Sequence, residues 1–113
     1  TKGEQLYDFV YISDCVNALY CAGIAGDDGA EYYLGSNHPQ RLYKYIEMIR
    51  DIVDPSIELN LGAIPFHGVR HGVEVYDCEK LMSHTKYNPE VTFEDGIMKT
   101  VQWLKEGKDG TTI

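Results

Sequence analysis

The segment from Asp14 to Ala25 constrains this chain most, because it reads as a helix without a polar side. In the run DCVNALYCAGIA only Asp14 and Asn17 are clearly polar. A helix that is apolar all round must be covered on every side, and a chain of 113 residues offers little material for that. We therefore expect that part of the protein lies outside this sequence and packs on this helix. The first residue, Thr1, fits that expectation.

Composition and charge narrow the function classes. The length allows one domain at most, and 43% hydrophobic with 25% charged residues is typical of globular chains. The net charge of −8 argues against nucleic acids and anionic membranes, which attract Lys/Arg clusters. No apolar run approaches the roughly 18 residues that a bilayer crossing needs, and no signal peptide is visible. We expect neither a nucleic-acid nor a membrane partner.

The cysteines indicate a reducing compartment. Cys15, Cys21 and Cys78 are odd in number and show no C-x-x-C spacing. A disulfide framework and a zinc site are both disfavoured by that pattern. Cys15 and Cys21 fall within the apolar helix, where a free cysteine behaves as a small hydrophobic residue. We expect a cytoplasmic protein.

Hydrophobic periodicity and turn residues predict alternating strands and helices. Strands are expected over residues 7–12, 31–34, 57–61 and 73–76, and helices over residues 14–25, 41–53, 77–83 and 92–106. Ser13 and Asp77 are the expected caps of two helices, and Thr92 with Asp95 forms a capping-box variant at a third. Residues 62–72 read as a loop. This alternation favours an α/β fold, although four short strands are too few for a complete doubly wound sheet.

Several segments resemble one family in the same order. Residues 6–18 (LYDFVYISDCVNA) resemble the "R-D-F-[IV]-[HY]-V-x-D-[VA]-[AV]-x-A" segment of the extended short-chain dehydrogenase/reductases, the NAD-dependent epimerase/dehydratase family. Residues 32–36 (YYLGS) are similar to its "Y-N-[IL]-G-[SG]" strand end. Residues 88–97 (NPEVTFEDGI), followed by Trp103, are similar to its closing signature. The resemblance implies an α/β, C-terminal fragment of a Rossmann-type enzyme, with few short strands and three to four helices.

The resemblance also implies a role. Residues 1–106 would form the C-terminal substrate-binding portion of an NAD(P)-dependent nucleotide-sugar epimerase, dehydratase or 4-ketoreductase, and residues 107–113 a polar tail. In the intact enzyme, NAD or NADP bound by an N-terminal domain exchanges a hydride with the sugar.

The sequence lacks the motifs that this chemistry needs. No Gly-rich dinucleotide turn occurs in it. The one Tyr-x-x-x-Lys match, Tyr76 to Lys80, follows the "YYLGS" segment, whereas the family's catalytic pair precedes that segment on a long helix. We expect no catalysis and no cofactor binding by this chain alone.

Arg70 is the candidate for a contact to the substrate phosphates. It lies in the loop where the family commonly has such an arginine, and His67 and His71 flank it, so the three form a plausible anion-binding loop. A solvated arginine is the alternative. Tyr7 stands where the family has an arginine near the phosphates, and a phenol lacks the charged guanidinium fork.

Other readings stay open. The chain is also compatible with a stand-alone α/β binding module whose apolar helix is buried in a homodimer. The intact enzyme, in turn, is compatible with a homo-oligomer. A metal module based on His67 and His71 is disfavoured, because Gly68 and Gly72 argue against a helix there. Asp14 is either a support near the substrate pocket or a first-turn helix residue. His38 and His84 belong to no partner pattern in the sequence and are expected at the surface.

Overall fold

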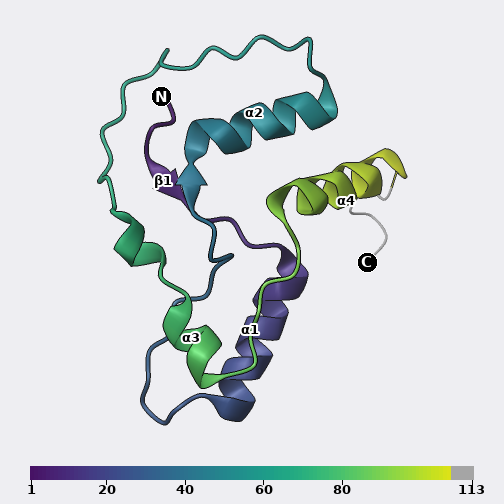
Figure 1. Ribbon diagram of the computed structural model, residues 1–113. Coiled ribbons are helices and arrows are strands. Elements are labelled where there is room, and N and C mark those ends of the chain that lie inside the picture. Colours follow the sequence, from purple (N-terminus) through teal and green to yellow (C-terminus); the bar gives the residue numbers. More distant parts are fainter. Residues whose placement is uncertain (108–113) are drawn as a thin grey trace.

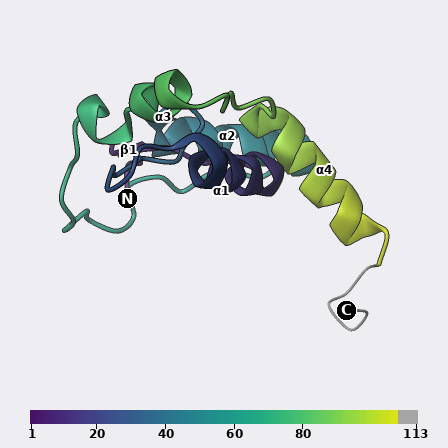
Figure 2. The same cartoon turned by 90° about the horizontal axis from the view of Figure 1, so that it is seen from below.

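The computed structural model describes residues 1–107 and shows a flat molecule (Figures 1 and 2). Its principal extents are 48 × 38 × 22 Å. The radius of gyration is 16.6 Å, larger than the about 13 Å of a compact chain of 100 residues. In chain order the elements are β1 (Leu6–Tyr7), α1 (Ile12–Ala25), β2 (Gln40–Arg41), α2 (Leu42–Val53), the 3-10 turn η1 (Val73–Tyr76), α3 (Glu79–His84) and α4 (Phe93–Lys105).

The fold is mixed α/β, with a very small sheet. β1 pairs with β2 antiparallel, and Leu6 faces Arg41 while Tyr7 faces Gln40. This is the only sheet in the part of the chain that the structure describes, and four α-helices accompany it. The predicted fold class, with few short strands and three to four helices, is confirmed.

Most of the predicted strands are wrong in detail. The strand expected over residues 7–12 ends at Tyr7, and α1 begins at Ile12 with Tyr11 as its N-cap, so Ser13 is not the cap. Residues 31–34 and 57–61 form no ladder, and residues 73–76 form a 3-10 turn. A strand needs a neighbour for its backbone N–H and C=O groups, and residues 1–107 provide none for these segments.

The helices follow the sequence pattern closely. α2 occupies Leu42–Val53 against the predicted residues 41–53. Asp77 accepts a hydrogen bond from the Glu79 N–H (2.9 Å) at the start of α3, and Thr92 accepts one from the Asp95 N–H (3.1 Å) at the start of α4. These ends depend on local side-chain caps, which a sequence shows directly. Leu104, in the last turn of α4, is 61% exposed.

Two small apolar clusters hold the elements together. Ala18 and Cys21 of α1 pack with Cys78, Leu81 and Tyr87, and α3 lies beside α1 in Figures 1 and 2. The second cluster joins α2 and α4: the buried Tyr45 ring lies 4.9 Å from the Phe9 ring and 4.5 Å from the Phe93 ring, measured between centroids.

α1 is buried on one side only. Asp14, Ala18 and Cys21 face the interior. On the other side, five large apolar side chains are between 58% and 66% exposed, namely Ile12, Val16, Leu19, Tyr20 and Ile24. This exposed side of α1 is what a helix without a polar face leads us to expect. Within residues 1–107, no helix combines the length and apolar character that crossing a bilayer requires.

Candidate functional site

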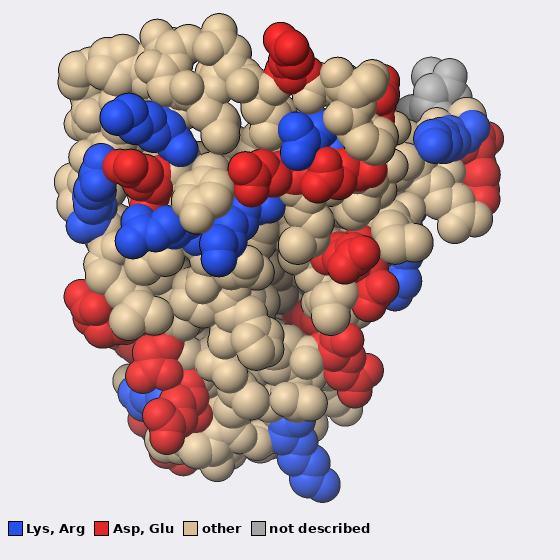
Figure 3. All heavy atoms as spheres, turned by 45° about the horizontal axis from the view of Figure 1, so that its top comes forward, with Lys and Arg blue, Asp and Glu red and all other residues tan. Residues whose placement is uncertain are grey.

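A cavity lined by two basic side chains and one acidic one lies between the N-terminal segment and the loop after α2. Its volume is about 370 Å³, and it is lined by Lys2, Glu4, Gln5, Gly62, Ile64, Pro65, Phe66 and Arg70. Figure 3 shows basic side chains gathered around acidic ones on the face that carries the N-terminal segment and the start of α2. In a chain of net charge −8, such a gathering of cations is a local exception. We call the cavity lined by these eight residues the Arg70 cavity.

Backbone hydrogen bonds fix the N-terminal wall of the Arg70 cavity. The first turn of α2 donates from the Leu42 N–H to Gln5 O and from the Tyr43 N–H to Gly3 O, both at 2.9 Å. Helix N-termini leave such N–H groups without intrahelical partners, so the N-terminal segment satisfies them. Gly3 has φ of +70°, and an added Cβ would lie 2.7 Å from the Tyr43 nitrogen. This position therefore requires glycine.

The opposite wall is tied to the same segment. The Gly62 N–H donates to Thr1 O (2.8 Å), which brings the loop of residues 62–72 to the N-terminus. Arg70 then points toward Glu4, with Nη2 at 3.4 Å from Glu4 Oε2. Its guanidinium carbon also lies 5.8 Å from the centroid of the Phe66 ring. Arg70 is 61% exposed, so its charge remains available to a ligand.

Two further cations belong to this surface, and the sequence did not reveal them. Lys2 lines the cavity, and Arg41 donates from Nη1 to the Glu4 carbonyl oxygen at 2.5 Å. Lys2, Arg41 and Arg70 are far apart in the chain, so no spacing rule connects them. The only sequence signal is their basic character in an acidic chain.

The structure separates the other predicted binding residues from Arg70. The Tyr7 ring stacks on Phe9, with centroids 5.8 Å apart, and Tyr7 does not line the Arg70 cavity. His67 and His71 are exposed in the same loop as Arg70, but neither lines the cavity. A role for Tyr7, His67 and His71 stays a prediction. Among residues 1–107, no group of three or more His, Cys, Asp or Glu side chains is placed to hold a metal ion.

Asp14 serves the fold. Its side chain is 5% exposed and accepts hydrogen bonds from the backbone N–H groups of Glu90 (3.1 Å) and Val91 (2.9 Å). It thus fixes the segment that enters α4 to the first turn of α1.

Asp8 works similarly at the end of the YYLGS segment. It accepts hydrogen bonds from the Ser36 N–H (3.0 Å) and the Tyr33 hydroxyl (3.1 Å). Burial and this carboxylate raise the pKa of Tyr33 well above its usual range. Both aspartates thus hold segments together that are distant in the sequence, and neither lines the Arg70 cavity.

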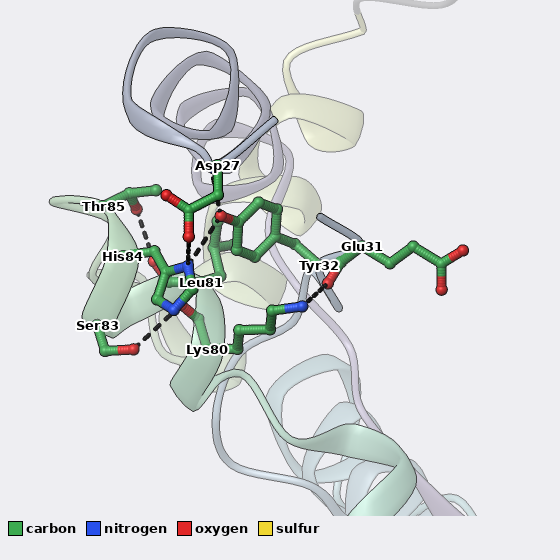
Figure 4. A network of polar contacts seen from close by, with 8 residues as sticks. All are labelled: Asp27, Glu31, Tyr32, Lys80, Leu81, Ser83, His84 and Thr85. Carbon is green, nitrogen blue, oxygen red and sulfur yellow. Dashed lines mark hydrogen bonds and ion pairs between the residues drawn. The ribbon is translucent and has the colours of Figure 1, made fainter. Parts of the chain in front are cut away.

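A polar network joins the end of α1 to α3 (Figure 4). His84 Nδ1 lies 2.9 Å from Asp27 Oδ2 and 3.0 Å from the Tyr32 hydroxyl. His84 is exposed, as expected, but no sequence pattern indicated these two partners. Lys80 donates to the Glu31 carbonyl (3.1 Å), and Tyr76 donates to the Leu6 carbonyl (2.8 Å). Tyr76 and Lys80 therefore both donate to backbone carbonyl oxygens.

Comparison with known proteins gives relatives that include nucleotide-sugar enzymes. No family model matches the chain. It is 29% identical over 111 residues to a dTDP-glucose 4,6-dehydratase of Escherichia coli K12, which covers 90% of this chain and 30% of that protein. It is 28% identical over 110 residues to the UDP-N-acetyl-alpha-D-glucosaminuronate decarboxylase of Bacillus cytotoxicus, covering 92% of this chain and 34% of that protein.

A solved structure agrees in fold. The Bordetella bronchiseptica enzyme WbmF, in complex with NAD+ and UDP, superposes with a TM-score of 0.75 at 22% identity, over 96% of this chain and 31% of WbmF. The chain thus spans about a third of the length of each of these proteins. These likenesses confirm the resemblance on which the sequence analysis relied. The chain is a relative of nucleotide-sugar enzymes in the extended short-chain dehydrogenase/reductase family, and it matches about a third of such a protein.

Proposed function

We propose that this chain is the nucleotide-sugar-binding portion of an NAD(P)-dependent epimerase, dehydratase or 4-ketoreductase. One observation carries the proposal: Lys2 and Arg70 line the Arg70 cavity of an otherwise acidic chain, and Arg41 donates to the carbonyl oxygen of Glu4, which also lines it. A nucleoside diphosphate carries its charge on a compact group that arginine can bind with two parallel hydrogen bonds. The named enzymes among the relatives act on nucleotide-linked sugars, as their names state.

Arg70 is the principal phosphate contact in this proposal. It is exposed, and the Phe66 ring supports its guanidinium from the side. Lys2 lies in the same cavity and supplies a second positive charge. In this proposal His67 and His71 lie beside the ligand at the outer part of the loop. Tyr7 contributes a phenol beyond the cavity, where its ring stacks on Phe9.

The cofactor belongs to the remainder of the protein. The structural relative WbmF holds NAD+, whereas residues 1–113 contain no Gly-rich dinucleotide turn. We assign NAD or NADP binding, and the hydride transfer, to a preceding cofactor domain, and expect no catalysis by this chain alone. Its free cysteines fit the reducing cytoplasm.

The exposed side of α1 is the surface that this cofactor domain would cover. Exposed apolar patches of this kind mark interaction sites, and the relatives have about twice as much chain again outside the matched third. Residues 31–34, which form no ladder here, would then gain a strand neighbour. Burial in a homodimer is the alternative. Charge substitutions on the exposed side of α1 distinguish the cofactor domain from a homodimer. They would weaken cofactor binding in the natural-length protein only if the cofactor domain is the neighbour.

Titration with uridine diphosphate tests the binding role. Isothermal titration calorimetry should show binding to the natural-length protein that weakens at least tenfold in Arg70→Gln, because a charge-assisted hydrogen bond contributes about 1.5–3 kcal/mol. Arg50→Gln is the matched control. Arg50 pairs with Asp51 on α2 and does not line the Arg70 cavity. Equal affinities of the two variants would reject Arg70 as the phosphate contact.

A further inference from the structure

The Arg70 cavity contains its own anion. Glu4 lines the cavity, and its carboxylate lies 3.4 Å from the Arg70 guanidinium. In a protein that binds a diphosphate through Arg70, this carboxylate occupies the position from which a phosphate oxygen would approach. Within residues 1–107, no other acidic side chain lines the cavity.

We propose that Glu4 is an internal competitor for the anion site of Arg70, which the incoming diphosphate must displace. This inference deepens the proposed function and rests on it. The Glu4 side chain is 48% exposed, so it can turn to solvent once a ligand replaces it. An exposed ion pair of this kind contributes at most about 1 kcal/mol, which a ligand that carries two charges readily exceeds.

The Arg70 guanidinium does not need Glu4 to stay in the cavity. It also lies over the Phe66 ring, 5.8 Å from its centroid, and such cation–π contacts hold a guanidinium without a carboxylate. The wall that carries Glu4 depends on backbone contacts, because Arg41 donates to the Glu4 carbonyl and not to its side chain. Removing the carboxylate charge therefore leaves the cavity and its cations in place.

A competing Glu4 and a positioning Glu4 predict opposite changes in ligand affinity for the substitution Glu4→Gln. If Glu4 competes, Glu4→Gln tightens the binding of uridine diphosphate by about fivefold, which is the factor that about 1 kcal/mol represents. If Glu4 instead orients Arg70 for the ligand, Glu4→Gln weakens binding. Glu58→Gln removes the same charge from an exposed position outside the cavity, so it corrects for the net charge of the protein.

The test is calorimetric titration of the natural-length protein, its Glu4→Gln and Glu58→Gln variants and the Arg70→Gln variant, each with a circular-dichroism check of folding. Tighter binding in Glu4→Gln alone supports the competitor. Unchanged or weaker binding in Glu4→Gln, with weaker binding in Arg70→Gln, overturns the competitor and leaves the proposed function standing. Absence of uridine diphosphate binding in every protein overturns the proposed function, and this inference with it.

Discussion

The two sides of α1 have similar hydrophobic character but opposite surroundings. One side packs Ala18 and Cys21 into a cluster with Leu81 and Tyr87 and carries the buried Asp14. The other presents Val16, Leu19 and Ile24 to solvent, each more than half exposed. The first side therefore determines how these residues fold, and the second determines what the chain associates with.

The difference shows that one helix can belong to two units. Its buried side joins α3 and the entrance to α4 by contacts that residues 1–107 supply. Its exposed side has the composition of a core, and no segment among residues 1–107 covers it. Because burying a leucine or isoleucine contributes about 1.5–3 kcal/mol, the uncovered side represents a large free energy that only another surface can recover.

Asp14→Ala should break the buried side most severely. The substitution leaves the N–H groups of Glu90 and Val91 without their acceptor, and we expect a loss of about 3 kcal/mol in the free energy of unfolding. Urea denaturation followed by circular dichroism measures it. Asp28→Ala, at an exposed position in the following turn, should change stability by less than about 0.5 kcal/mol. A similar loss in both variants would show that Asp14 acts through charge and not through these two hydrogen bonds.

Ala18→Leu should damage the same side through packing. Ala18 is fully buried against the cluster of Cys21, Leu81 and Tyr87, and overpacking such a site costs about 1–3 kcal/mol. The same substitution at Ala25, exposed in the last turn of α1, provides the control and should be nearly neutral. Equal unfolding midpoints for the two variants would mean that the cluster has room for the larger side chain.

Whether a feature could be predicted from the sequence depended on how far apart in the chain its interacting residues lie. α2 and the cap of α4 were correct because their signals lie within a few residues, as with Thr92 and Asp95. The prediction that this chain leaves part of the apolar helix uncovered was also correct, because the absence of a polar face in residues 14–25 is a local property.

Long-range features were missed or displaced. Strand pairing depends on neighbours that residues 1–107 do not supply for residues 31–34 and 57–61, so patterns read along the chain predicted ladders that do not form. The cations around Glu4 come from three distant segments: Lys2 and Arg70 line the cavity with it, and Arg41 binds its carbonyl oxygen. The family resemblance supplied Arg70, but only the folded chain brings the other two beside Glu4.

Raising the pH should weaken the contribution of the buried side of α1 to stability. Burial raises the pKa of Tyr87, which packs in this cluster and donates to Gly35 O (2.7 Å). The folded state thus favours the neutral phenol, and this contribution is complete below the ordinary tyrosine pKa of about 10. It declines as pH rises above that value toward the folded pKa. We expect about 1 kcal/mol less stability at about pH 11 than at about pH 9, measured by urea denaturation, and a smaller difference in Tyr87→Phe.

Leu19→Glu should have the smallest effect on stability and the clearest effect on association. Leu19 is 64% exposed, so the free energy of unfolding of the 113-residue chain should change by less than about 0.5 kcal/mol. The same charge should interrupt the exposed side of α1, and we expect less self-association in sedimentation velocity and less binding of a hydrophobic dye. Glu placed at Leu81, fully buried on α3, is the contrasting variant and should unfold the chain. A loss of stability in Leu19→Glu comparable with that of Leu81→Glu would mean that both sides of α1 are interior, and the distinction between a folding side and an association side would fail.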